Sequence, residues 1–367
     1  MPALNVLIKP VSSSCNLNCR YCFYKDVSSH RETSNYGIMS LDTLDLIMRR
    51  IFEYADGECT IAWQGGEPTL ANLSFFQNYL QLEQMYNTKK IHVNRSIQTN
   101  GYQLNKNWAS FFSENHFLVG LSLDGTQYTH DTFRKTRENA GCFSSILSTI
   151  ELFDQYHVDY NILTVVNSVT ASEVNNIYSF YKKKRFHYQQ YIACLDPLGE
   201  VPGQHPWSLT PEQYGSFLTE LFQLWYQDAL SGRAPYIRQF ENYIGILLGF
   251  PPEACEQSGV CGQQKVIEAD ASVYPCDFYV TDEYCLGNLR ENSFENIQCS
   301  SRQQSFIKAS MLFPQKCKKC SYLPLCRNGC HRHRSNADGT NYFCQSYQMF
   351  FEKCIPLLKD LAQKIRS

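Results

Sequence analysis

The chain of 367 residues contains no apolar run as long as the roughly 18 residues that a membrane span requires. It also has no strong charge of either sign, since 33 basic and 35 acidic residues leave a net charge of −2. A balanced charge argues against binding of nucleic acid through its phosphates. The opening segment MPALNVLIKP has no basic stretch before a long apolar one, so we expect no signal peptide and a soluble, cytoplasmic protein. We find no internal repeat and no low-complexity segment.

Cysteine, in contrast, is abundant, with 17 residues. In a cytoplasmic protein these are expected to be metal ligands or buried small residues rather than disulfides. Cys15, Cys19 and Cys22 form a C-x3-C-x2-C pattern shortly after an apolar run. Three thiolates on one short loop can hold a [4Fe–4S] cluster and leave its fourth iron open to a substrate or cofactor. Zinc is the alternative, but it needs a fourth ligand, and no second cysteine or histidine pair lies near. The pattern therefore favours an enzyme that does chemistry at an iron–sulfur cluster.

The C-terminal third carries a second, dense set of cysteines. Eight thiolates are enough for two fully ligated [4Fe–4S] clusters, although two zinc sites would use the same number. A reactive cluster upstream favours electron-carrying clusters here, because a redox reaction needs a route for its electrons. The eight residues are Cys255, Cys261, Cys276, Cys317, Cys320, Cys326, Cys330 and Cys344. The remaining six are scattered and are interpreted as structural: Cys59, Cys142, Cys194, Cys285, Cys299 and Cys354.

Short apolar runs alternate with longer amphipathic stretches from residue 4 to about residue 195. Strand–helix–strand repetition predicts parallel strands with crossover helices, which defines the α/β class. Six units are visible instead of the eight of a closed barrel, so we expect a partial (β/α)6 barrel with ligands at the carboxyl ends of its strands. The motifs CNLNCRYC, GGEP, TNG and SLDG lie at those ends. The predicted strands are Leu4–Ile8, Cys59–Gln64, His92–Gln98, Leu118–Leu123, Asp159–Val166 and Tyr188–Cys194.

The domain organisation follows from a change of character beyond Pro251, where cysteines become dense and strands short. Residues 264–279 predict a hairpin that turns at Asp270–Ser272. We expect a partial barrel over residues 1–235, a cysteine-rich domain over 236–344 and a closing helix over 345–367. The predicted helices lie near residues 41–55, 72–86, 104–115, 142–157, 171–184, 211–231, 237–249 and 345–366.

The segment CNLNCRYCFY, together with GGEP at residues 65–68, resembles the radical S-adenosylmethionine (SAM) enzymes. The C-terminal cysteines resemble the SPASM extension of that superfamily, which binds two auxiliary [4Fe–4S] clusters. Over nearly its full length the chain resembles the anaerobic sulfatase-maturating enzymes. The segments that carry this resemblance are LIKPVSSSCNLNCRYCFY, WQGGEPTLA, SIQTNGYQL, FLVGLSLDG, ACLDPL, VYPCDFYV and CKKCSYLPLCRNGCHRHR.

The resemblance implies three [4Fe–4S] clusters and SAM as cofactors. Cys15, Cys19 and Cys22 would hold the catalytic cluster, whose open iron binds SAM. The SAM molecule would further contact Tyr21 and Leu195 at its adenine, Gly66 at its amine, Ser122 at its ribose and Arg134 at its carboxylate. The first auxiliary cluster would use Cys255, Cys261, Cys276 and Cys330, and the second Cys317, Cys320, Cys326 and Cys344.

The implied reaction is oxidation of a cysteine or serine, in a sulfatase segment of C/S-x-P/A-x-R type, to Cα-formylglycine through a 5′-deoxyadenosyl radical. Asp277 falls on the catalytic base of the family, and Tyr24, Gln64 and Arg238 are candidates for substrate contacts. The implied partners are a sulfatase polypeptide and a ferredoxin or flavodoxin, with no nucleic acid and no membrane. From the residues alone, each of these side chains can also be an ordinary turn or surface residue.

Two other functions remain open at this point. A maturase that forms thioether or carbon–carbon crosslinks in a ribosomal peptide would use the same radical. A non-catalytic iron–sulfur or zinc protein would use the cysteines for electron transfer or as a scaffold.

Overall fold

The computed structural model describes residues 3–262, 264–334 and 337–366. The chain divides into two compact units, each built from three stretches of sequence. Unit one comprises Met1–Ser122, Lys135–Tyr160 and Gly262–Lys308, and unit two comprises Leu123–Arg134, Asn161–Cys261 and Ala309–Ser367. Among the described residues, no helix has the length and apolarity that crossing a bilayer demands.

Four parallel strands form the middle of unit one, in the order β1-β2-β3-β4. They are β1 (Leu4–Ile8), β2 (Glu58–Trp63), β3 (His92–Thr99) and β4 (Phe117–Ser122), so the predicted strands are confirmed with shifts of one residue at most. The sequence LNVLI of β1 is apolar at four of five positions, and four of its residues are buried. A nearly continuous apolar run is typical of a parallel strand that is covered on both faces.

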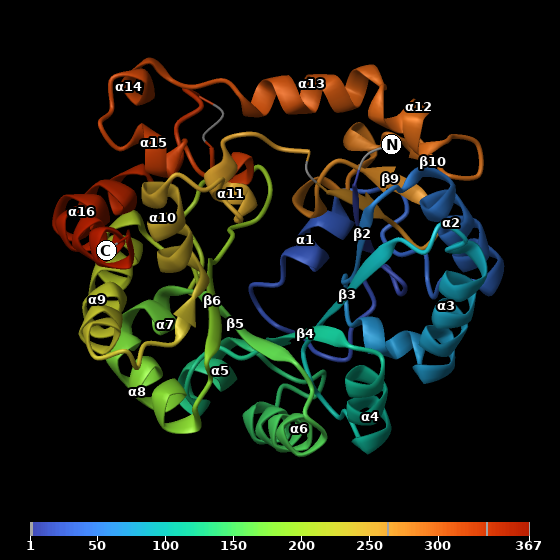
Figure 1. Ribbon diagram of the computed structural model, residues 1–367, viewed down its shortest axis with the longest axis horizontal. Helices are drawn as coiled ribbons and strands as arrows, with labels where there is room; N and C mark the ends of the chain where they lie inside the picture. The colour runs from blue at the N-terminus through green and yellow to red at the C-terminus, as the bar shows by residue number, and fades with distance from the viewer. Residues whose placement is uncertain (1–2, 263, 335–336, 367) are drawn as a thin grey trace. The chain divides into compact units, whose positions relative to one another are not determined.

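Helices α2 (Leu41–Tyr54), α3 (Leu73–Tyr86) and α4 (Lys106–Glu114) lie on one side of these strands, and α1 (Phe23–Ser29) lies on the other (Figure 1). Short polar side chains begin three of the helices, because Ser40, Asn72 and Asn105 each accept a hydrogen bond from a backbone N–H in the first turn. An aromatic cluster fills the space between β2 and α3, where the ring of Trp63 lies 5.3 Å from Phe76 and 4.9 Å from Tyr79. Helix α6 (Phe143–Tyr156) completes this layer.

A segment far along the chain continues the sheet beyond β1. Strand β8 (Lys265–Ile267) pairs parallel with β1, with Val6 opposite Lys265 and Ile8 opposite Ile267. Strand β9 (Ser272–Tyr274) returns antiparallel to β8, which confirms the predicted hairpin, and β10 (Gly287–Asn288) pairs with β9. The sequence predicted the hairpin but not its place beside the first strand.

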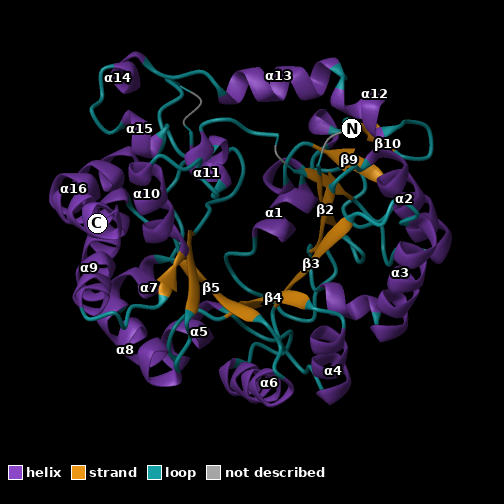
Figure 2. Cartoon of the chain, in the orientation of Figure 1, coloured by secondary structure: helices purple, strands orange, loops and turns teal. Residues whose placement is uncertain are grey.

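In unit two, β6 (Tyr188–Ala193) pairs in parallel with β7 (Tyr236–Ile237) and with β5 (Tyr160–Val166), which enters this unit at Asn161. The long helices α9 (Pro211–Leu230) and α16 (Cys344–Arg366) run side by side (Figure 2). Gly215 allows this approach, since a Cβ there would lie 2.8 Å from the sulfur of Met349. Helix α9 begins with a reciprocal capping box between Thr210 and Gln213.

Further helices complete the chain. Unit two also contains α5 (Gln127–Phe133), α7 (Ser168–Ser172), α8 (Val174–Lys184), α10 (Arg238–Leu248) and the short helices α11 (Cys255–Ser258), α14 (Gln315–Lys318) and α15 (Leu323–Cys326). Helix α12 (Phe294–Gln298) belongs to unit one, and α13 (Ser301–Ser310) begins there. The single-turn helices η1 to η4 span Pro68–Ala71, Asp277–Tyr279, Asp282–Tyr284 and His331–His333. The short helices of the cysteine-rich region were not predicted, because one turn leaves no periodicity to detect.

Candidate active site and cluster-binding cysteines

The three N-terminal cysteines lie on one loop between β1 and α1. Each is half-buried, and Cys22 is the residue directly before α1. Burial, Glu67 and the nearby Cys19 and Cys22 raise the pKa of the Cys15 thiol to about 12. Crowded, desolvated thiols become thiolates only beside positive charge, so this donor set fits a cationic metal cluster.

The GGEP turn touches this loop through its second glycine. Gly66 has a φ of +46°, and a Cβ at this position would lie 2.0 Å from the backbone oxygen of Ser14. The buried Glu67 carboxylate then accepts hydrogen bonds from the backbone N–H groups of Thr69 and Asn100. Gly65 is close to another side chain, since its Cβ would lie 2.6 Å from Cγ of Lys9. The turn is therefore built to admit neighbouring parts of the chain, and the contact of Gly66 with SAM stays a prediction.

Asp277 lies in a polar cluster of unit one. Its Oδ2 accepts hydrogen bonds from the hydroxyl of Tyr24, at 2.6 Å, and from Nε2 of Gln64, at 3.4 Å. Its Oδ1 lies 3.0 Å from Nζ of Lys9. Three of the site residues predicted from sequence (Asp277, Tyr24 and Gln64) are thus in direct contact. Desolvation and the Asp277 carboxylate raise the pKa of Tyr24 well above its usual value, so the phenol stays a donor.

The fold explains how this cluster forms. Asp277 follows β9 by three residues and opens the short helix η2, which packs against α1. The ring of Phe278 meets that of Phe23 at 4.9 Å. Because Tyr24 is the second residue of α1, this packing brings its hydroxyl to the carboxylate.

The other predicted SAM contacts are distributed over both units. In unit one, Ser122 ends β4 and its hydroxyl accepts a hydrogen bond from Gln98, and Tyr21 is half-buried between two of the cysteines. In unit two, Leu195 is half-buried two residues beyond β6. The Arg134 guanidinium forms a buried, two-pronged pair with Asp124, at 2.8 and 3.2 Å. Asp124 therefore orients the guanidinium of Arg134. The contact of Arg134 with a SAM carboxylate stays a prediction.

Arg238, a predicted substrate contact, opens helix α10 in unit two. Its Nη1 donates a hydrogen bond to Oε1 of Gln190 on β6, at 3.3 Å. The residue is half-buried.

Four C-terminal cysteines of unit two line a common cavity of about 60 Å³. They are Cys317, Cys320, Cys326 and Cys344, and the cavity wall also includes Lys316 and Tyr347. Burial raises the pKa of Cys326 to about 12, with contributions from the other three thiols of the cavity. Four convergent thiols around one small cavity fit a four-cysteine metal cluster.

A second group of thiols in unit two surrounds Cys330. Burial, together with the nearby Cys255 and Cys261, raises the pKa of Cys330 to about 12. Cys330 is separated by only four positions from Cys326, yet it is not among the residues that line the cavity. Cys276 belongs to unit one, where it directly precedes Asp277. Of the six scattered cysteines, Cys59, Cys142, Cys194 and Cys354 are buried, Cys285 is half-buried and Cys299 is exposed.

Sequence interpretation missed two residues that contact the N-terminal cysteine loop. Asn100 donates from Nδ2 to the sulfur of Cys15 at 3.6 Å, and Arg137 donates to the backbone oxygen of Cys15. Asn100 belongs to the TNG motif at the end of β3, so its place at a strand end was a usable signal. Lys9, the partner of Asp277, gave no such signal, because a single lysine after a strand is ordinarily solvated.

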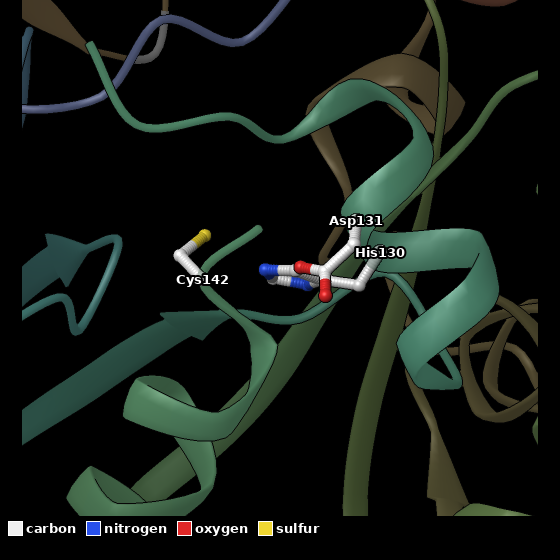
Figure 3. A group of neighbouring side chains, drawn as sticks. All are labelled: His130, Asp131 and Cys142. Carbon is white, nitrogen blue, oxygen red and sulfur yellow. The ribbon is translucent and has the colours of Figure 1, made fainter. Parts of the chain in front are cut away.

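A polar group in unit two lies outside these sites. His130 and Asp131 are neighbours on α5 (Figure 3). His130 is 1% exposed, its Nδ1 accepts the backbone N–H of Asp124, and burial lowers its pKa to about 4. The imidazole is therefore a neutral acceptor that supports the loop carrying Asp124.

Comparison with known proteins agrees with a metal-binding role for the N-terminal and C-terminal groups of cysteines. Residues 10–181 match the sequence model of the radical SAM superfamily, and residues 255–321 match that of an iron–sulfur cluster-binding domain, SPASM. The chain is a radical SAM enzyme with a SPASM domain, which confirms the predicted α/β fold class and excludes a non-catalytic scaffold.

The relatives define the family more narrowly. The chain is 46% identical to a cysteine-type anaerobic sulfatase-maturating enzyme of Clostridium novyi, over all of this chain and 99% of the relative. It is 30% identical to a serine-type enzyme of Bacteroides thetaiotaomicron, over 99% of this chain and 92% of the relative. A solved structure of anSMEcpe with bound AdoMet and a Cp18Cys peptide is 43% identical, matches with a TM-score of 0.94, and covers 99% of this chain and 100% of that one. The chain belongs to the anaerobic sulfatase-maturating enzymes, as the sequence motifs predicted.

Proposed function

We propose that this enzyme oxidises a peptidyl cysteine, in a sulfatase segment of C-x-P/A-x-R type, to Cα-formylglycine, and that a serine at the same position is a poorer substrate. The higher identity to the cysteine-type relative than to the serine-type relative supports this order of preference. The observation that carries the chemistry is the contact of Asp277 with Tyr24 and Gln64, because it provides a buried, oriented carboxylate.

The cofactor set we propose is SAM and three [4Fe–4S] clusters. Cys15, Cys19 and Cys22 would hold the catalytic cluster, and SAM with this cluster supplies a 5′-deoxyadenosyl radical that removes a hydrogen atom from the substrate β-carbon. Tyr21, Gly66, Ser122, Arg134 and Leu195 would hold SAM. Cys255, Cys261, Cys276 and Cys330 would hold the first auxiliary cluster, and Cys317, Cys320, Cys326 and Cys344 would hold the second. One of the two auxiliary clusters would take up the remaining electron.

The residues of the chain then have defined tasks. Asp277 accepts the thiol proton of the substrate at Oδ2, the oxygen that faces Tyr24 and Gln64. Loss of a β-hydrogen atom, a thiol proton and one electron leaves a thioaldehyde, which water converts to the aldehyde with release of sulfide. Tyr24 and Gln64 orient the carboxylate and can turn their donors to the substrate, while Arg238 contacts the bound peptide.

The electron partner we propose is a ferredoxin or flavodoxin. Domain boundaries at residues 235 and 344 and a cytoplasmic location stay predictions from the sequence.

A direct test is mass spectrometry of a sulfatase-derived peptide after incubation with the reconstituted, reduced enzyme and SAM. The expected product has lost sulfur, gained oxygen and reacts with a hydrazide. A peptide with serine in place of the cysteine gives the same product more slowly. A peptide that loses only hydrogen would indicate the thioether or carbon–carbon crosslink, and deoxyadenosine without any modified peptide would overturn the proposed substrate.

A further inference from the structure

Lys9 is a buried cation in contact with the Asp277 cluster. Lys9 is 3% exposed, and its Nζ lies 3.0 Å from Oδ1 of Asp277 and 3.8 Å from Oε1 of Glu268. The ammonium also lies over the ring of Tyr24, 4.8 Å from its centroid. The same lysine therefore contacts both the carboxylate and the aromatic residue that donates to it.

The charges around Lys9 balance. Glu268 is fully buried and pairs with Nη1 of Arg31 at 2.7 Å, and Arg31 is itself 7% exposed. Two cations, Lys9 and Arg31, thus face two carboxylates, Glu268 and Asp277. Burying ions costs free energy, and removing one member of such a group is strongly destabilising because it leaves another charge unpaired. The four residues are hereafter called the charge quartet.

The fold places the quartet at the junction of the first strand and the C-terminal hairpin. The backbone N–H of Lys9 donates to the carbonyl of Ile267 at 2.9 Å, which continues the pairing of β1 with β8. Glu268 follows β8 directly. Gly65 leaves room for the stem of Lys9, because a side chain at Gly65 would overlap Cγ of the lysine.

We propose that Lys9 is a positioning residue for the catalytic base, an inference that rests on the proposed function of Asp277. By binding Oδ1, the ammonium fixes the rotation of the carboxylate. Oδ2 is then left to Tyr24, Gln64 and the substrate thiol. The Lys9 ammonium contacts Asp277, Glu268 and the ring of Tyr24. We therefore expect its loss to affect proton removal more than SAM cleavage.

The first experiment compares Lys9→Met, which keeps the stem and removes the charge, with the wild-type holoenzyme. We expect the ratio of aldehyde to deoxyadenosine to fall about 10- to 100-fold, the scale of a misplaced catalytic group, while the KM for the peptide changes little. Lys9→Arg retains the charge and should restore part of the ratio. Lys182→Met is the matched control, since Lys182 pairs with Asp228 outside the quartet and its loss should leave the ratio unchanged.

The second experiment uses the unloaded protein and therefore does not depend on catalysis. Lys9→Met leaves the quartet with one excess negative charge, Asp277→Asn leaves one excess positive charge, and the double variant is neutral. We expect each single variant to lower the melting temperature and the double variant to lower it by less than the sum of the two. If Lys9→Met alone does not fold, the neutral double variant should fold.

The outcomes distinguish three statements: that Lys9 acts through Asp277, that the charges of the quartet balance, and that Asp277 is the catalytic base. An unchanged aldehyde-to-deoxyadenosine ratio in Lys9→Met, or a double variant that makes clearly less aldehyde than Asp277→Asn alone, would overturn positioning through Asp277. Additive melting shifts, or a double variant that does not fold, would overturn the charge balance. Full aldehyde yield from Asp277→Asn would instead remove the catalytic base itself, which is a failure of the proposed function.

Discussion

Tyr24 and Asp277 are 253 residues apart in the chain, yet the phenol donates a 2.6 Å hydrogen bond to the carboxylate. The contact joins helix α1, which follows Cys22, to the segment that follows Cys276. In the proposed reaction, this hydrogen bond orients the carboxylate that accepts the substrate proton.

Replacement of Asp277 by Asn should separate SAM cleavage from substrate oxidation. We expect aldehyde formation to fall about 100- to 10,000-fold, the usual contribution of a general base, while deoxyadenosine is still released. Chromatography of deoxyadenosine and mass spectrometry of the peptide measure both products. Asp282→Asn, at an exposed carboxylate in the same segment, should change neither; wild-type aldehyde yield from Asp277→Asn would contradict the assignment.

Tyr24→Phe tests the hydrogen bond alone. A hydrogen bond to a charged group contributes about 1.5–3 kcal/mol, so kcat for aldehyde should fall about 10- to 150-fold. The phenylalanine ring retains the contact with Phe23 and the ammonium of Lys9. Steady-state kinetics with the peptide provide the measurement, and an effect confined to KM would show that Tyr24 binds substrate without acting on the base.

Gly66→Ala should be damaging for a steric reason. The new Cβ would meet the backbone oxygen of Ser14 and push the cysteine loop away. Gly57→Ala is a matched control, because Gly57 also has a positive φ, +82°, but open space around it. We expect Gly66→Ala to be less stable than Gly57→Ala by at least about 2 kcal/mol in denaturant unfolding. Equal stability of the two variants would show that the loop yields easily.

Iron analysis can test the assignment of Cys330 to the first auxiliary cluster and of its sequence neighbour Cys326 to the second. Each [4Fe–4S] cluster carries four iron atoms, so three clusters give about twelve per chain. Combining Cys255→Ala with Cys330→Ala should remove no more iron than either change alone, whereas combining Cys326→Ala with Cys330→Ala should remove about eight atoms. Cys59→Ala is the control, since this thiol is buried in β2. Additive iron loss for Cys255 and Cys330 would place them in different clusters.

His130 should make the unloaded protein sensitive to acid. Its pKa is about 4 in the folded state and 6.5 otherwise, so the unfolded chain takes up the proton first as the pH falls below 6.5. The contribution of the neutral His130 to the free energy of unfolding is therefore fully present above pH 6.5 and is lost as the pH falls towards 4. Relative to His130→Gln, the wild type should lose about 2 kcal/mol more between pH 7 and pH 5. His187→Gln, at an exposed position, should follow the wild type; equal losses in His130→Gln would contradict the buried neutral imidazole.

Local features of this molecule were visible in the sequence. The strands from β1 to β6 were predicted within one residue because most of them are short, largely apolar segments that alternate with helices. Strand β3, with the sequence HVNRSIQT, is the polar exception. The N-terminal cysteine loop could also be recognised from the sequence, since its three cysteines lie within eight consecutive positions.

Contacts between segments that are distant in the sequence could not be predicted. The pairing of β8 with β1 involves no local pattern, and the burial of Lys9 depends on two carboxylates that lie more than 250 positions away. A lysine alone is expected in solvent, and only its partners reverse that expectation. The grouping of Cys330 away from Cys326 has the same origin: it reflects how the short helices fold rather than how the cysteines are spaced.

The pairing of β1 with β8 also has a consequence for biosynthesis. While the ribosome is still making the middle of the chain, the apolar strand LNVLI has β2 on one side and an open edge on the other. That edge can accept a foreign strand until Lys265–Ile267 emerges and covers it. Newly made chains should therefore be most prone to aggregate, and unable to acquire a complete active site, until translation has passed the hairpin.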